Sequence, residues 1–149
     1  MAVQAEIDNS TIPFIKCGFA AKIDGVIAQD AQRTTELKQF TVMSQIAATG
    51  LWTPFNSVAG TDGSAVPRGI YLGGDIDAAD LVAGNISNAE ILVGFYVTVD
   101  EDQVVFDDET LTKASVINTG TVEARTAEQA LRDIGIYIED SVNISEYEN

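Results

Sequence analysis

Short apolar runs alternate with polar turns rich in Gly, Asp and Asn along most of this chain. The strongest run, Glu90–Val99, is dominated by β-branched and aromatic residues and predicts a strand. Shorter runs at 40–43, 51–55, 65–72 and 136–138 predict further strands. No internal repeat and no linker-like stretch interrupts the series. The pattern therefore predicts one mainly β domain.

The segments 51–55 and 65–72 flank a loop that carries Asp62-Gly63, a tight-turn dipeptide. Glycine adopts positive φ without a steric cost, and an Asp side chain accepts hydrogen bonds from nearby backbone amides. The only tryptophan of the chain, Trp52, lies in the first segment. Nothing in this unit has the character of a reaction centre, so we interpret it as scaffold.

Three further segments carry weaker signals. Asp24-Gly25 predicts a small hairpin turn within 21–27. The polar stretch 30–39 predicts a short helix. The acidic residues 100–102 predict a turn after the strongest strand, and 103–106 would then return beside that strand as the second arm of a hairpin.

Two helices are predicted in the last third of the chain. The first covers 109–115 and follows a candidate N-cap at Asp107 or Asp108. A short strand at 120–123 comes next. The second helix covers 127–134 and ends before Gly135, a residue suited to the position after a helix. It begins with the capping box formed by Thr126 and Gln129.

Residues 1–16 predict an extended N-terminal arm, and 17–149 a single β-rich domain. The arm is polar until it reaches the apolar sequence Ile12, Pro13, Phe14 and Ile15. Proline cannot donate a ladder hydrogen bond and biases the residue before it towards extended geometry. Sixteen extended residues span roughly 50 Å, so the arm could reach a neighbouring subunit. We expect it to be disordered in the free protein.

Charge excludes several classes of function. The 149 residues include 8 basic and 23 acidic side chains and no histidine, for a net charge of −15. Nucleic acids and anionic membranes need a positive surface, so neither is an expected partner. No signal peptide and no apolar run of about 18 residues is present, and we expect synthesis in the cytoplasm. The lone Cys17 permits no internal disulfide and is expected to be a small buried side chain.

Candidate chemistry is sparse. The acids of Asp75–Asp80 do not match a calcium loop, in which oxygen ligands stand at positions one, three and five, glycine at six and glutamate at twelve. The acids within 100–109 suggest a hairpin tip and a helix N-cap, with adventitious Ca²⁺ or Mg²⁺ as an alternative. Lys113 and Ser115 are two residues apart and would point in different directions on a helix. We assign no catalytic, metal-binding or cofactor-binding residue.

The order of motifs resembles a known family. A strand with Trp52, Thr53-Pro54 and Phe55 leads into Thr61-Asp62-Gly63, and the acidic Asp75–Asp80 follows. Further on come the sequences Ile91-Leu92-Val93-Gly94-Phe95-Tyr96 and Gly135-Ile136-Tyr137-Ile138. Over residues 40–138 this order resembles the head decoration (capsid cement) proteins of tailed bacteriophages, the lambda protein D type.

The resemblance implies a β-clip-like fold, with small β-barrel or sheet structure, two short helices and the N-terminal arm. It implies a homotrimer without enzymatic activity that sits on the outer surface of an expanded phage head in the virion. There it would bind the major capsid protein of the same phage and stabilise the shell. The expected capsid-binding residues are Ile12, Pro13, Phe14 and Ile15, and the candidate trimer interface is Trp52, Pro54 and Phe55.

Two alternatives remain open. An acidic β-domain enzyme or a divalent-cation-dependent binding module would work through Asp75–Asp80 or the acids within 100–109. A tail or fibre component of a virion would share the β-rich composition.

Overall fold

The computed structural model describes residues 13–117 and 124–140. The strands are β1 (Ile15–Ile27), β2 (Val42–Gln45), β3 (Trp52–Pro54), β4 (Pro67–Tyr71), β5 (Ile86–Asp100), β6 (Val116–Ile117), β7 (Arg125–Thr126) and β8 (Ile136–Glu139). The helices within the described ranges are α1 (Ala78–Ala83), α2 (Ala127–Asp133) and one 3₁₀ turn, Glu101–Gln103. The predicted class, mainly β with a barrel-like sheet and two short helices, is confirmed.

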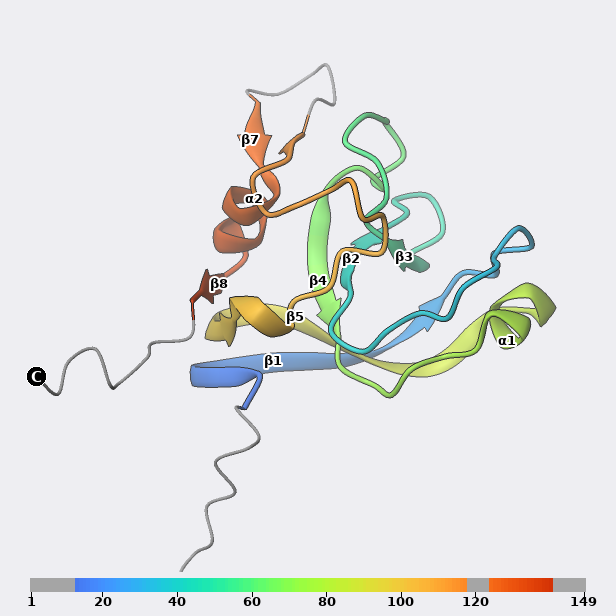
Figure 1. The fold of residues 1–149 in the computed structure, drawn as a ribbon, viewed down its shortest axis with the longest axis horizontal. Helices are drawn as coiled ribbons and strands as arrows, with labels where there is room; N and C mark the ends of the chain where they lie inside the picture. The colour runs from blue at the N-terminus through green and yellow to red at the C-terminus, as the bar shows by residue number, and fades with distance from the viewer. Residues whose placement is uncertain (1–12, 118–123, 141–149) are drawn as a thin grey trace, which may run out of the picture.

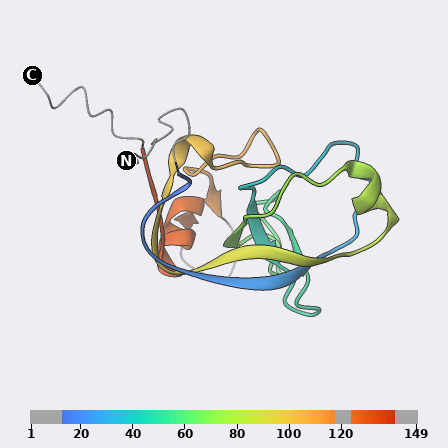
Figure 2. The same ribbon diagram turned by 90° about the horizontal axis from the view of Figure 1, so that it is seen from below.

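The main sheet closes on itself. Its strands follow the order β1-β3-β2-β4-β5, and β1 and β5 pair antiparallel along most of their length to complete the ring. The two strands run side by side across the molecule in both ribbon views (Figures 1 and 2). β8 joins the C-terminal half of β5 in parallel, on the side away from β1, and β6 and β7 form a separate two-stranded ribbon.

Two hydrophobic clusters make up the core, and β5 contributes to both. The first cluster packs α2 against the sheet and includes Leu92 and Leu131. The second includes Trp52, Leu81 and Ile91. Ile91 and Leu92 are neighbours in sequence, and successive residues of a strand point to opposite faces. This part of β5 is therefore buried on both faces, which explains why its sequence reads as a continuous apolar run.

Several local predictions are confirmed. The capping box of α2 is present, with both reciprocal hydrogen bonds between Thr126 and Gln129. Gly135 follows α2 with φ of 90°. In the central loop Gly63 has φ of 98°, and Asp62 Oδ1 accepts hydrogen bonds from the backbone amide and the hydroxyl of Ser64. The segments 51–55 and 65–72 contain β3 and β4, although β2 lies between them in the sheet.

The predicted hairpin at 21–27 is wrong, because β1 runs through Asp24-Gly25 without turning. Asp24 pairs with Glu90, and Gly25 pairs with Ala89. A Cβ atom on Gly25 would lie 2.8 Å from the Trp52 ring. Glycine is therefore needed at this position because of close packing and not because of a turn.

The other weak predictions are also wrong. Residues 30–39 and 109–115 contain no helix, and α1 was not predicted. Residues 103–106 do not return beside β5. Instead Val105 bonds the backbone next to β2, donating to Phe40 O at 3.0 Å. Asp108 caps a turn, accepting hydrogen bonds from the amide and hydroxyl of Thr110, and not a helix. The predicted strand at 120–123 lies outside the described residues.

The N-terminal arm needs a correction at its C-terminal end. Ile15 opens β1 and pairs with Val99, so it belongs to the sheet. Phe14 is only 7% exposed, lies in the first core cluster and stacks on Phe40 with ring centroids 4.0 Å apart. Pro13 is exposed, and Ile12 lies outside the described residues. Phe14 and Ile15 are therefore not available as parts of a detachable arm, because the core of their own chain holds them.

Candidate functional site

The residues predicted for a trimer interface are mostly buried in their own chain. Trp52 lies in the second core cluster and Phe55 in the first, where Phe55 packs edge-on against Phe106 with centroids 6.3 Å apart. Pro54 is half-buried. The prediction that Trp52 and Phe55 form an interface is therefore corrected: these large aromatic side chains fill the core and present no surface to a partner.

Exposed aromatic residues gather instead on the outer side of the β1–β5–β8 sheet. Phe19 lies opposite Tyr96, Cys17 lies opposite Thr98, and Thr98 lies beside Tyr137. Partners that lie directly opposite on neighbouring strands project from the same face of a sheet. These five residues therefore form two rows on one face of the sheet. We call this surface the outer aromatic face. Figure 1 shows β8 at the end of the molecule where it lies beside β5.

Three of the five side chains of the outer aromatic face, those of Cys17, Phe19 and Tyr96, are exposed to solvent, whereas Tyr137 is half-buried and Thr98 is buried. Phe19 is 76% exposed and Tyr96 62% exposed, while their β5 neighbours Val97 and Val99 point inward and are fully buried. The rings of Tyr96 and Tyr137 lie 5.4 Å apart at an angle of 56°. With aromatic side chains of 150–250 Å² each, Phe19 and Tyr96 alone expose roughly 300 Å². An area of this size lies at the lower end of the range for the largest apolar patch on a monomeric protein, a patch that is often functional.

Cys17 is exposed on the same face, so the prediction that it is buried is wrong. It lies on β1, opposite Thr98. Its position follows from the strand alternation, which places Cys17 and Phe19 on the outer side of the sheet.

The Asp75–Asp80 segment leads into α1 and has structural contacts of its own. Asp75 Oδ1 accepts a hydrogen bond from the backbone amide of Gln39 at 2.8 Å. Asp77 stands at the N-cap of α1, without a side-chain capping bond. Across residues 13–117 and 124–140, no three His, Cys, Asp or Glu side chains come together in a way that could hold a metal ion.

Several of the acids within 100–109 make separate structural contacts. Asp100 is buried and accepts hydrogen bonds from the amide of Asp102 at 3.2 Å and from Gln103 Nε2 at 2.9 Å. Glu101 forms an ion pair with Lys113. Asp107 forms an ion pair with Arg33. These carboxylates face different partners and do not converge on one point.

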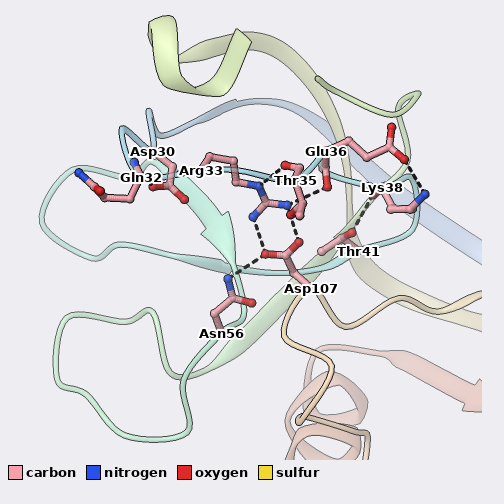
Figure 3. Close-up of polar contacts among 9 residues, drawn as sticks. All are labelled: Asp30, Gln32, Arg33, Thr35, Glu36, Lys38, Thr41, Asn56 and Asp107. Carbon is pink, nitrogen blue, oxygen red and sulfur yellow. Dashed lines mark hydrogen bonds and ion pairs between the residues drawn. The ribbon is translucent and has the colours of Figure 1, made fainter. Parts of the chain in front are cut away.

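The Arg33–Asp107 pair is the centre of a polar cluster that joins two long loops (Figure 3). The guanidinium also donates to the backbone oxygens of Thr35 and Glu36, at 2.7 and 2.9 Å. Asn56 Nδ2 donates to the Asp107 carboxylate at 2.9 Å. Because each charged group is surrounded by partners within the chain, we interpret the cluster as a structural clasp.

Lys113 and Ser115 do not form a catalytic dyad. The carboxylate of Glu101 accepts a hydrogen bond from Lys113 and raises the pKa of its ammonium group above the ordinary value. A lysine general base needs the opposite shift. Ser115 Oγ accepts a hydrogen bond from the amide of Thr112 at 2.8 Å, which fixes it in the local turn.

No protein-family model matches the chain, and no curated protein is significantly similar to it. None of the helices within the described ranges has the length and apolar character needed to cross a bilayer.

Proposed function

We propose that this protein is a capsid decoration protein that binds the outer surface of an expanded phage head as a trimer and stabilises the shell. The single observation that supports it most is the outer aromatic face, defined by Phe19, Tyr96 and their neighbours, which exposes aromatic surface suited to a protein contact on a closed β domain. The resemblance of residues 40–138 to decoration proteins supplies the class of partner, the major capsid protein of the same phage.

The proposed mechanism is binding, with no catalytic step. A protein that binds the assembled shell, but not its separated subunits, stabilises the shell by mass action. The total stabilisation of the shell would be large because the protein would bind at many equivalent sites on one particle. The acidic surface, with a net charge of −15, would keep unbound subunits apart before docking and would suit the outside of the virion.

Co-sedimentation with purified heads tests this proposal. Full-length protein is mixed with expanded heads that lack decoration, assembled from the major capsid protein of the same phage, and the pellet is assayed over a range of concentrations. We expect saturable binding and a higher melting temperature of the shell. Unexpanded heads are the matched control and should bind much less. Protein that stays in the supernatant with both kinds of head would contradict the proposal.

A further inference from the structure

We propose that the outer aromatic face is where copies of this chain pack against one another. This inference rests on the proposed function, because it assigns the subunit contact within the proposed oligomer. The sequence predicted the interface at Trp52 and Phe55, but both side chains are buried in the core of their own chain. The outer aromatic face is proposed in their place.

The absence of charge on this face favours a second copy as its occupant. Each chain carries a net charge of −15, so most contacts between identical copies would place carboxylates near one another. The rows Cys17–Thr98–Tyr137 and Phe19–Tyr96 contain no Asp, Glu, Lys or Arg. Interface centres are depleted of charged residues and enriched in tyrosine and phenylalanine, as this face is.

The rim of the face carries charges of both signs. Lys16, Lys22 and Asp24 lie on β1, and Lys16 Nζ donates to the backbone oxygen of Asp140 at 2.8 Å. Glu139, two residues after Tyr137 on β8, is exposed and adds an acid to this rim. Lys22 contacts Glu90 of β5 at 3.4 Å, and both side chains are about half exposed. A rim with both signs can pair with a copy of itself, whereas a purely acidic rim would repel one.

The free edge of β1 adds to the available contact area. β5 pairs with one edge of β1, and along the other edge the described structure shows pairing only at Ile27, with Trp52. A stable interface buries about 800 Å² on each partner, more than the roughly 300 Å² of Phe19 and Tyr96. These side chains would form the centre of the contact, and the β1 edge and the charged rim would complete it.

A single patch of this kind can join copies of the chain into an oligomer with closed rotational symmetry. Side chains that lie close to a rotation axis meet their own equivalents in the neighbouring copies. Phe19 and Tyr96 would then pack against Phe19 and Tyr96 of the other copies around the axis.

Light scattering and sedimentation of the full-length chain over a dilution series test the proposal. The variants Phe19→Ser and Tyr96→Ser remove exposed aromatic side chains from the face. Val82→Ser on α1 and Val116→Ser on β6 remove exposed apolar side chains elsewhere and serve as matched controls. We expect each face variant to weaken self-association by about tenfold or more and the controls to leave it unchanged. Circular dichroism verifies that every variant is folded.

The single cysteine gives a second readout that needs no substitution. Cys17 lies on the outer aromatic face, so packing of copies should shield it from a maleimide reagent. We expect the rate of alkylation to rise on dilution and in the two face variants, but not in the Val82 and Val116 controls.

Three results would overturn the inference. The wild-type chain could stay monomeric at every concentration, or the face variants could retain the wild-type mass. The face variants could also lose binding to heads while their oligomeric state is unchanged, which would assign the face to the shell. None of these results by itself overturns binding to heads, which is measured separately with the wild-type chain, although a monomer at every concentration would contradict a trimer that forms before docking.

Discussion

The guanidinium of Arg33 and the carboxylate of Asp107 form a bidentate ion pair, with both N–O distances 2.5 Å, across 74 residues of sequence. The two side chains are only 6% and 10% exposed. The pair joins the loop after β1 to the loop after β5, in which the regular structure is limited to isolated β-bridges and one 3₁₀ turn.

Breaking this pair should destabilise the protein strongly. Asp107→Asn leaves the buried guanidinium without its counter-charge and should lower the free energy of unfolding by roughly 3 kcal/mol. Urea denaturation of this variant, of Arg33→Met and of the double variant measures the coupling. The exposed pair between Lys38 and Glu36 is the control, and Glu36→Gln should leave stability unchanged. Additive effects of Arg33→Met and Asp107→Asn would show that the pair is not coupled.

Two N-terminal deletions should show by their stability where the folded domain begins. Phe14 is buried, stacks on Phe40 and accepts a backbone hydrogen bond from Asp100, so Phe14→Ala should cost roughly 3–4 kcal/mol. Deletion of residues 2–16 should destabilise the fold for the same reason. Deletion of 2–12 should leave the melting temperature nearly unchanged, and it is the variant that can test capsid binding by the terminal segment. Equal melting temperatures for both deletions would contradict this account of Phe14.

Gly25 should not tolerate a side chain. In Gly25→Ala the new Cβ would lie 2.8 Å from the Trp52 ring, so the ring or the β1–β5 pair must shift. Crowding of a packed core costs typically 1–3 kcal/mol. The measurement is thermal denaturation together with Trp52 fluorescence, which reports the ring directly. Gly74→Ala is the matched control, because no atom lies within 4 Å of a Cβ at that position. An unchanged emission spectrum and melting temperature for Gly25→Ala would show that the space between residue 25 and the Trp52 ring accommodates a methyl group.

Calcium should have little effect on stability. No cluster of ligands was found in the parts of the chain that the structure describes, and the spacing within Asp75–Asp80 departs from a calcium loop. Melting curves are compared in millimolar Ca²⁺ and in EDTA. A rise of more than about 5 °C with Ca²⁺, roughly 1–2 kcal/mol for a domain of this size, would favour a cation-dependent binding module.

Sequence patterns correctly predicted the elements that are determined by residues close together in the sequence. The capping residues Thr126 and Gln129 determine where α2 begins, and the apolar run at 90–99 belongs to β5. The patterns failed where long-range packing overrides a local signal. Asp24-Gly25 has turn chemistry, but pairing with β5 holds it in a strand. Asp108 has the chemistry of a cap but begins only a turn.

The candidate binding surface could not be predicted from the sequence. Phe19 and Tyr96 are 77 positions apart, and only the register of β1 against β5 places them opposite each other. β-Bulges within that pairing change which residues face outward, so simple alternation does not locate the face. Trp52 and Phe55 were predicted to form an interface, but both are buried in two core clusters that are assembled from distant segments, which the local sequence does not reveal.

Electron cryomicroscopy of expanded, undecorated heads before and after saturation with the full-length chain tests the central claim most directly. The account predicts added density on the outer surface of the shell, in copies related by threefold symmetry, each of which accommodates the closed β domain. Heads that show no added density at a saturating concentration of the protein, or density confined to the tail, would contradict it.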